Sequence, residues 1–252
     1  MIKKLKSIII KIYIKAKERR FNVSDQVLKY IFLPSRTNSK RLIVVFSGFA
    51  GHNVPGKYNY VRTLNDNMDN KLFILDDFGY KSVGSYYLGN NFELYQLGCV
   101  ENLIDYIKRK SNAKELIFVG SSKGASSALI YGLKLNIDKI ICASPQYHIA
   151  QYLHQNEYHE CILNSIIDES AENEVLLDQL IDRSIDANEG NTEIDMLYSD
   201  QEASFKVDVR YLIDSIEKKG LRCKLQNIPY TEHSDTGKYF IPFLKKTLNG
   251  EN

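Results

Sequence analysis

The sequence predicts an α/β fold in which helices cover both faces of a mostly parallel β-sheet. The first observation is that short apolar, β-branched runs alternate with amphipathic segments along the chain. The second is that polar or Gly-containing loops follow several of these runs, where ligands bind in such sheets. The third is the composition, because 252 residues with 44% hydrophobic and 25% charged side chains suit a globular domain with a sizeable core.

The predicted strands are short, and several are rich in branched apolar residues. They span residues 27–33, 41–46, 71–75, 116–119, 138–144, 193–198 and 222–228. Helices are predicted between them, with a short helix in residues 57–70, an amphipathic helix at 92–110, a helix after residue 124, and helices at 204–219 and 239–248. Gly220 is a suitable C-terminal stop for the helix that precedes it.

Residues 1–26 are predicted to form a basic N-terminal arm ahead of a single domain at residues 27–252. The first 20 residues combine Lys and Arg with Ile, Leu and Tyr, which suits a basic amphipathic helix. Lys11 and Lys15 interrupt its apolar run and no small-residue cleavage site follows, so we expect neither a secretory signal nor a membrane span. We expect the arm to dock on the domain or on a partner chain, with peripheral contact to an anionic membrane as the alternative. We expect the protein to be cytoplasmic.

Residues 146–190 differ in character from the rest of the chain. They are acidic and helix-prone, and they lack a bounded apolar run of the kind that predicts a strand. We interpret this segment as a helical lid or cap inserted over the ligand-binding edge of the sheet.

The sequence Gly120-Ser121-Ser122-Lys123-Gly124 lies between a predicted strand and a predicted helix. It has the form G-x-S-x-G, in which the glycines allow so sharp a turn that the middle serine is held exposed above the sheet edge. Ser122 is therefore the candidate nucleophile. The alternatives are an ordinary Gly/Ser turn in an inactive domain of this fold, or a phosphate cradle.

A serine nucleophile needs a base to take its proton and an acid to orient that base. His233 follows the last predicted strand, and Asp200 follows the strand before it. The chain order Ser122, Asp200, His233 is the order expected for this kind of turn. As alternatives, His233 caps the final helix and Asp200 caps the helix that follows it. Asp195 and Asp235 are weaker candidates for the acid.

An oxyanion formed during acyl transfer needs preorganised N–H donors. We expect one from the backbone of Lys123, at the helix start where the helix dipole favours negative charge. The second is expected from Phe49 in the loop after strand 41–46, with Ala50 as the neighbouring choice. The side chain of Lys123 either adds positive charge beside the pocket or faces solvent.

Three further residues are predicted to contact substrate. His52 lies in the same loop as Phe49, and as the base it would break the expected chain order. Tyr86 and Tyr87 lie in the Gly/Tyr-rich sequence GSYYLG and are expected to line the pocket and stack on sugar rings. The alternative for both tyrosines is packing beneath their loop.

From about residue 27 onward, the chain resembles the α/β-hydrolase superfamily. The segments that carry the resemblance are GSSKG, the Ser-Gly-Phe loop, YSDQE and the C-terminal EHS. The resemblance implies the α/β-hydrolase fold and places the nucleophile, acid and base on Ser122, Asp200 and His233. Two departures are Ser47-Gly48 where many members have His-Gly, and Lys123 at a position that is usually apolar. GSYYLG and the compact size are similar to bacterial accessory-secretion and capsule-biosynthesis proteins of this superfamily, a group associated with acetyl-group chemistry on glycans.

These observations predict a serine hydrolase that acts through an acyl-enzyme on Ser122, either an acetyl-esterase or an acyltransferase on a glycan or small-molecule ester. The alternative is a non-catalytic module of the same fold in a secretion or capsular polysaccharide assembly complex; peptidase activity ranks last. A net charge of +2 gives no field strong enough to bind nucleic acid. We expect no cofactor and no metal, because HQNEYHE at residues 154–160 does not match H-E-x-x-H and the four cysteines are scattered.

Overall fold

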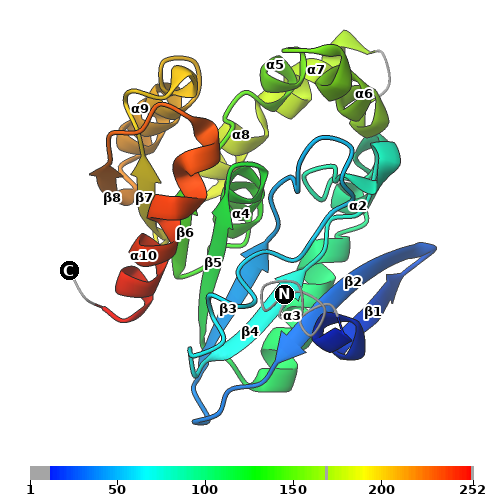
Figure 1. The fold of residues 1–252 in the computed structure, drawn as a ribbon, viewed down its shortest axis with the longest axis vertical. Helices are drawn as coiled ribbons and strands as arrows, with labels where there is room; N and C mark the ends of the chain where they lie inside the picture. The colour runs from blue at the N-terminus through cyan, green and yellow to red at the C-terminus, as the bar shows by residue number, and fades with distance from the viewer. Residues whose placement is uncertain (1–11, 168–169, 251–252) are drawn as a thin grey trace, which may run out of the picture.

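A computed structural model of the protein describes residues 12–167 and 170–250, and a single sheet runs through it (Figure 1). Its strands follow the order β1-β2-β4-β3-β5-β6-β7-β8. Strands β3 to β8 are parallel to one another, whereas β2 is antiparallel to both β1 and β4. The bounds are β1 (Glu18–Val23), β2 (Gln26–Leu33), β3 (Arg41–Phe46), β4 (Asn70–Ile74), β5 (Glu115–Ser121), β6 (Lys139–Ala143), β7 (Glu193–Tyr198) and β8 (Arg222–Asn227). The predicted mostly parallel sheet is confirmed.

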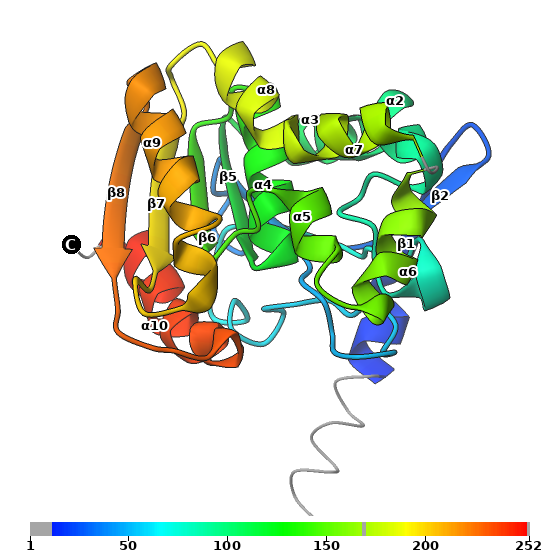
Figure 2. The ribbon, with the colours of Figure 1, turned by 90° about the horizontal axis from the view of Figure 1, so that it is seen from above.

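Helices lie on both faces of the sheet, with α3, α4 and α8 on one side and α10 on the other (Figure 2). The α-helices are α2 (Glu93–Gln96), α3 (Cys99–Ser111), α4 (Lys123–Lys134), α5 (Ile149–Leu153), α6 (Glu157–Ile166), α7 (Ala171–Asp178), α8 (Leu180–Ala187), α9 (Val209–Lys219) and α10 (Thr236–Leu248). Short 3-10 turns occur at η1 (Tyr80–Ser82), η2 (Asn90–Phe92), η3 (Ala203–Phe205) and η4 (His233–Asp235).

Side-chain alternation along the central strands divides the core into two parts. In β3, Leu42 and Val44 point to the face covered by α3, α4, α8 and α9, whereas Ile43 and Val45 point to the face covered by α10. All four side chains are essentially inaccessible to solvent. This two-sided burial explains why the strand reads as a continuous apolar run in the sequence.

The segment predicted as a lid forms the helices α5 to α8, and α5, α6 and α7 lie above the carboxyl ends of the strands (Figure 1). Its entry is fixed by the buried carboxylate of Asp208, which accepts hydrogen bonds from the backbone N–H groups of Tyr147 and His148, both at 2.9 Å. Asp178 of α7 accepts from the N–H of Ala150 at 2.6 Å. The helix α5 therefore begins on two carboxylates contributed by other parts of the chain.

The N-terminal segment differs from the predicted arm at residues 1–26, of which the first 20 were expected to be helical. Residues 12–17 are helical, but Glu18–Val23 forms β1, and a two-residue turn at Ser24 and Asp25 leads into β2. The reason is that polar and apolar side chains alternate at the end of this segment, a strand pattern that its basic composition obscures. Phe21 and Val23 pack against the part of the core on the face covered by α3 and α4. Residues 1–11 of the predicted arm lie outside the described residues.

Three predicted helices also differ. Residues 57–70 form turns and no helix within the described structure. The helix predicted at 92–110 is divided into α2 and α3 at Gly98, whose φ of 62° is a left-handed conformation that suits glycine. The helix predicted from residue 204 begins later, at Val209, after the turn η3.

Candidate functional site

Ser122 stands alone between the end of β5 at Ser121 and the start of α4 at Lys123. Its φ of 54° and ψ of −129° are strained for a residue with a side chain, so the surrounding structure must hold them. A hydrogen bond of 2.9 Å from the Ser122 N–H to the Ala143 carbonyl ties this residue to the end of β6. The geometry is that of a sharp strand–turn–helix elbow, as the G-x-S-x-G pattern predicts.

The two glycines of the motif are needed for different close contacts. A Cβ atom on Gly120 would lie 2.0 Å from the carbonyl oxygen of Gly124, so the helix could not pack so closely on the strand. A Cβ atom on Gly124 would lie 2.6 Å from the carbonyl oxygen of Phe46 in β3. Both contacts are with backbone atoms, which cannot rotate away as a side chain can. Steric exclusion therefore explains why both of these positions are glycine.

His233, at the start of η4, points its ring at Ser122. Its Nε2 atom lies 2.8 Å from the Ser122 Oγ atom, and its Nδ1 atom is hydrogen-bonded to the Oε1 atom of Glu202. The structure thus brings together the two residues that the sequence placed after β5 and β8, and adds an acid that the sequence analysis did not select.

Asp200 is not the partner of His233, and this expectation is wrong in geometry. β7 ends at Tyr198, and Asp200 lies in the exposed turn that follows, where its N–H donates to the Asn227 Oδ1 atom at 3.2 Å. The chain turns inward only at Glu202, which is 5% exposed and has the longer side chain. The signal was present in YSDQE, because a glutamate two residues beyond the first acid can serve equally well.

The carboxylate of Glu202 is enclosed by donors. Besides His233, it accepts hydrogen bonds from the hydroxyls of Ser144 at 3.1 Å and Ser204 at 2.8 Å. Burial acts to raise the pKa of Glu202, but the hydrogen bond and charge of His233, with the two serine hydroxyls, outweigh burial and hold that pKa below its usual value. Glu202 is therefore ionised at neutral pH.

Gln146 is a further site residue that sequence reasoning missed. Its Nε2 amide group donates to the Ser122 Oγ atom at 2.8 Å, and its own backbone N–H and carbonyl are both bonded to the Ser126 hydroxyl. Because Gln146 donates to the serine oxygen, the serine proton is left to point at His233. Only the position of Gln146 just after β6, beside the elbow, could have indicated it.

The two predicted oxyanion donors lie beside the elbow. The Lys123 N–H opens α4, and Phe49 lines the same pocket as Ser122. Neither N–H donates to another residue in the part of the chain that the structure describes. The loop that holds Phe49 passes close to the elbow, because a Cβ atom on Gly48 would lie 3.2 Å from the Ser121 carbonyl.

The Lys123 side chain neither faces solvent nor enters the pocket. It is completely buried and donates to the Oδ2 atom of Asp76, which is equally buried. Burial lowers the pKa of Lys123, opposed by the charge and hydrogen bond of Asp76. Asp76 also accepts from the N–H groups of Ser85 and Tyr87, and Gly84 passes so close that a Cβ atom there would lie 2.7 Å from Lys123 Nζ.

A pocket of about 570 Å³ opens over Ser122 and His233. The segment predicted as a lid supplies Tyr152, Asn156, Tyr158 and His159 to its wall, and the loop after β3 supplies Phe49 and His52. Lid and loop touch through the rings of His52 and Tyr158, whose centroids are 4.1 Å apart, and through a 3.0 Å hydrogen bond from the Asn53 N–H to the Tyr158 hydroxyl.

Tyr86 and Tyr87 do not line this pocket, contrary to the prediction. Both side chains are completely buried. The hydroxyl of Tyr87 accepts from the Ser47 N–H at 2.6 Å and donates to the Ile74 carbonyl at 2.9 Å. These tyrosines pack beneath their own loop, which was the alternative interpretation, and they also contact the loop after β3 through Ser47 and Phe49.

The strand order, the antiparallel β2 and the serine elbow after β5 define the α/β-hydrolase fold, and this chain has it. No protein-family model and no curated protein sequence matches the chain. Capsule O-acetyltransferase of Neisseria meningitidis serogroup A is similar in structure, with a TM-score of 0.76 and 19% identity over 93% of this chain and 99% of that chain. At these identities the likeness concerns the fold.

Two other solved structures are similar. The glycosylation-associated protein (Gap123) complex from Streptococcus agalactiae gives a TM-score of 0.71 at 18% identity, over 92% of this chain and 46% of that chain. Est1E from Butyrivibrio proteoclasticus gives a TM-score of 0.58 at 17% identity, over 92% of this chain and 99% of that chain.

Among residues 12–167 and 170–250, no helix is long and apolar enough to cross a membrane, and no three acidic, His or Cys residues are grouped as a metal site.

Proposed function

We propose that this protein is a serine-dependent acyl-transferring enzyme, an esterase or O-acyltransferase, with Ser122 as nucleophile. The observation that carries the proposal is the continuous line from the Ser122 hydroxyl through both ring nitrogens of His233 to the buried, ionised carboxylate of Glu202. Such a line supplies a base for the serine proton and an anion that stabilises the imidazolium formed.

In the first half-reaction, Ser122 Oγ attacks the carbonyl carbon of an ester as His233 Nε2 takes its proton. The oxyanion is held by the N–H groups of Lys123 and Phe49, at the positive end of the α4 dipole. His233 then gives the proton to the departing alcohol, and the acyl group remains on Ser122. Glu202 stays ionised throughout and keeps the Nδ1 proton of His233 in place.

In the second half-reaction, His233 Nε2 takes a proton from the acceptor as the acceptor attacks the acyl carbon, and returns that proton to Ser122 Oγ as the acyl–serine bond breaks. Water as acceptor gives an esterase, and a sugar hydroxyl gives an O-acyltransferase. The aromatic wall of Phe49, Tyr152 and Tyr158 supports a sugar ring as part of the substrate, because rings of this kind pack against the faces of pyranosides. The structural likeness to a capsule O-acetyltransferase supports an acetyl group on a glycan.

The test is the Ser122→Ala variant, assayed beside the wild type on p-nitrophenyl acetate and on an acetylated sugar. We expect a loss of activity of at least about 10⁴-fold, since the whole acyl-enzyme route depends on this hydroxyl. Ser121→Ala is the matched control, because the Ser121 hydroxyl is bonded to Tyr60 rather than to His233. Equal activity of Ser122→Ala and wild type would end the proposal.

A second candidate is a non-catalytic module of this fold within a multiprotein complex, which the likeness to the Gap123 complex favours. A fluorophosphonate probe separates the two, since it reacts only with an activated serine. We expect labelling of the folded wild type at Ser122 and none of Ser122→Ala. Failure to label a well-folded wild type would favour the module.

A further inference from the structure

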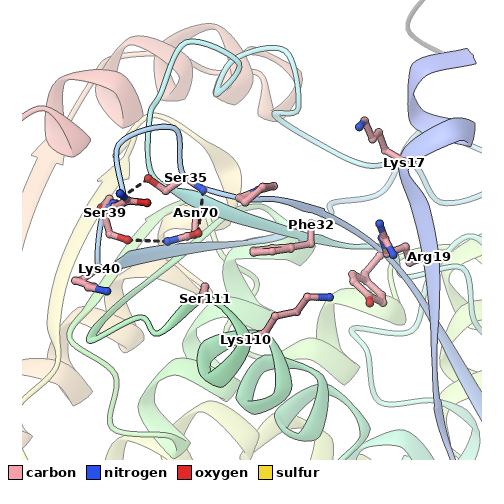
Figure 3. Close-up of a pocket in the computed structure, with 12 residues that line it drawn as sticks. Lys17, Arg19, Phe32, Ser35, Ser39, Lys40, Asn70, Lys110 and Ser111 are labelled. Carbon is pink, nitrogen blue, oxygen red and sulfur yellow. Dashed lines mark hydrogen bonds between the residues drawn. The ribbon is translucent and has the colours of Figure 1, made fainter.

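A second pocket, of about 590 Å³, is shown in Figure 3 and lies at the other end of the sheet from Ser122. Lys40 precedes β3 and Asn70 opens β4, so these residues mark the amino ends of the parallel strands, whereas Ser122 follows the carboxyl end of β5. The remaining wall comes from the end of α3, from β2 and the loop that follows it, and from Lys17 and Arg19. The pocket is therefore separate from the site described above.

Four cationic side chains line this pocket: Lys17, Arg19, Lys40 and Lys110. No Asp or Glu is among its lining residues, and none of the four cations forms an ion pair within the described part of the chain. The neighbouring acid, Asp69, is already engaged by Arg41 at 3.6 Å and by the Ser39 hydroxyl at 2.6 Å. The positive charge of the pocket is thus left uncompensated.

The cations are arranged around an aromatic floor. In Figure 3 the Phe32 ring lies between Lys40 on one side and Arg19, Lys17 and the tip of Lys110 on the other. Tyr30, 4% exposed, completes the floor. Burial and Tyr106 raise the pKa of Tyr30 while Lys110 and Arg19 act against them, which places both cations within electrostatic reach of one hydroxyl.

The polar end of the pocket is rigid. The buried Asn70 side chain accepts from the Ser35 N–H and donates to the Ser39 carbonyl, both at 2.9 Å. The Ser35 hydroxyl in turn accepts from the Ser39 N–H at 2.9 Å. The loop at residues 35–39 is therefore held in one shape without any ligand, as a preformed binding site requires.

We propose that this pocket binds a phosphate-bearing small molecule whose ring packs against Phe32. A phosphate is favoured because the four cations come from different elements and have no acidic partner, and because a guanidinium matches two phosphate oxygens at once. The volume exceeds that of phosphate alone and lies in the range of small-molecule sites. An anionic lipid headgroup offers the same phosphate chemistry from another source.

The experiment is calorimetric titration of the full chain with glucose 1-phosphate, glucose and inorganic phosphate. We expect glucose 1-phosphate to bind, inorganic phosphate to bind more weakly, and glucose not to bind. Arg19→Gln and Lys110→Gln should each weaken glucose 1-phosphate binding about tenfold. Phe32→Leu should weaken glucose 1-phosphate but not inorganic phosphate.

Two matched controls remove the same charge outside the pocket. Arg20→Gln changes the residue of β1 that follows Arg19. Arg109→Gln changes the residue of α3 that precedes Lys110, and Arg109 is paired with Asp105. Both should bind as the wild type does, and so should Ser122→Ala, which makes the result independent of the proposed activity. Each variant is checked for an unchanged thermal midpoint.

Three results would overturn the proposal. These are no binding of glucose 1-phosphate, equal weakening by the control variants, or loss of binding in Ser122→Ala. A second experiment tests the lipid source by measuring how much protein sediments with phosphatidic acid vesicles and with phosphatidylcholine vesicles. Vesicle binding that depends on Arg19 and Lys110 without binding of glucose 1-phosphate would assign the pocket to a lipid headgroup instead.

Discussion

Glu202 is buried and bonded to the Nδ1 atom of His233. As an ionised carboxylate it can only accept hydrogen bonds. In Glu202→Gln an amide replaces one carboxylate oxygen, so the side chain can donate to Nδ1 and favour the wrong tautomer of His233. We expect the rate on p-nitrophenyl acetate to fall by about 10²- to 10⁴-fold with the fold intact, measured as kcat/KM beside circular dichroism.

The matched control is Asp200→Asn, two residues away on the exposed turn. It should change kcat/KM less than about twofold, because Asp200 does not contact His233. If Asp200→Asn were the more damaging substitution, the assignment of the acid to Glu202 would be withdrawn.

Individual site residues could be predicted from the sequence only in part. Ser122 and His233 were found from the sequence because each is tied to the end of a strand, and strand ends are readable from apolar runs. Asp200 was predicted as the acid and Glu202 was not considered, because the choice depends on which way a turn faces. Gln146 was beyond prediction, because an amide has no motif and acts only through its distance to Ser122.

The strand–turn–helix elbow depends on a backbone approach that only glycine permits. In Gly120→Ala the new methyl group meets the Gly124 carbonyl, and strand and helix must separate. We expect a loss of about 3 kcal/mol or more in the free energy of unfolding, measured by urea titration, together with loss of fluorophosphonate labelling.

Gly237→Ala is the control for this prediction. Gly237 lies in α10, and a Cβ atom there would meet nothing within 4 Å. Alanine should keep or slightly raise the stability, by up to about 1 kcal/mol, because it is the better helix former. Equal destabilisation by both substitutions would mean that the steric explanation of the motif is wrong.

Elements with a two-sided apolar environment were the easiest to predict. The strands at 41–46 and 193–198 have the predicted bounds. β1 was missed because Arg and Asn alternate with Phe21 and Val23, and the charges suggested a solvent-exposed arm. The helix predicted in residues 57–70 was wrong, because a polar segment beside the smaller core is held by its tertiary contacts rather than by helix propensity.

At the scale of the whole molecule, Lys123 and Asp76 join the elbow to the end of β4 and to the turn that holds Ser85 and Tyr87. In Lys123→Met the Asp76 carboxylate remains buried without a counter-charge. We expect a loss of about 3–5 kcal/mol in the free energy of unfolding, measured by urea titration.

The double variant Lys123→Met with Asp76→Asn tests the cause. A neutral amide removes the unpaired charge, and its oxygen can still accept from the N–H of Tyr87. The double variant should therefore be more stable than Lys123→Met alone. If it is less stable by the full sum of the two single losses, the pair is not coupled in this way.

The Lys123–Asp76 pair also has a consequence for the order of events during folding. Its partners are 47 positions apart in the chain, and neither charge can leave water until the other is in place. The turn that holds Ser85 and Tyr87 and the helix α4, which begins at Lys123, must therefore be buried together. Under the proposed function, a half-folded chain would lack the two N–H donors in place and its serine would be chemically idle, so esterase activity would report completed folding.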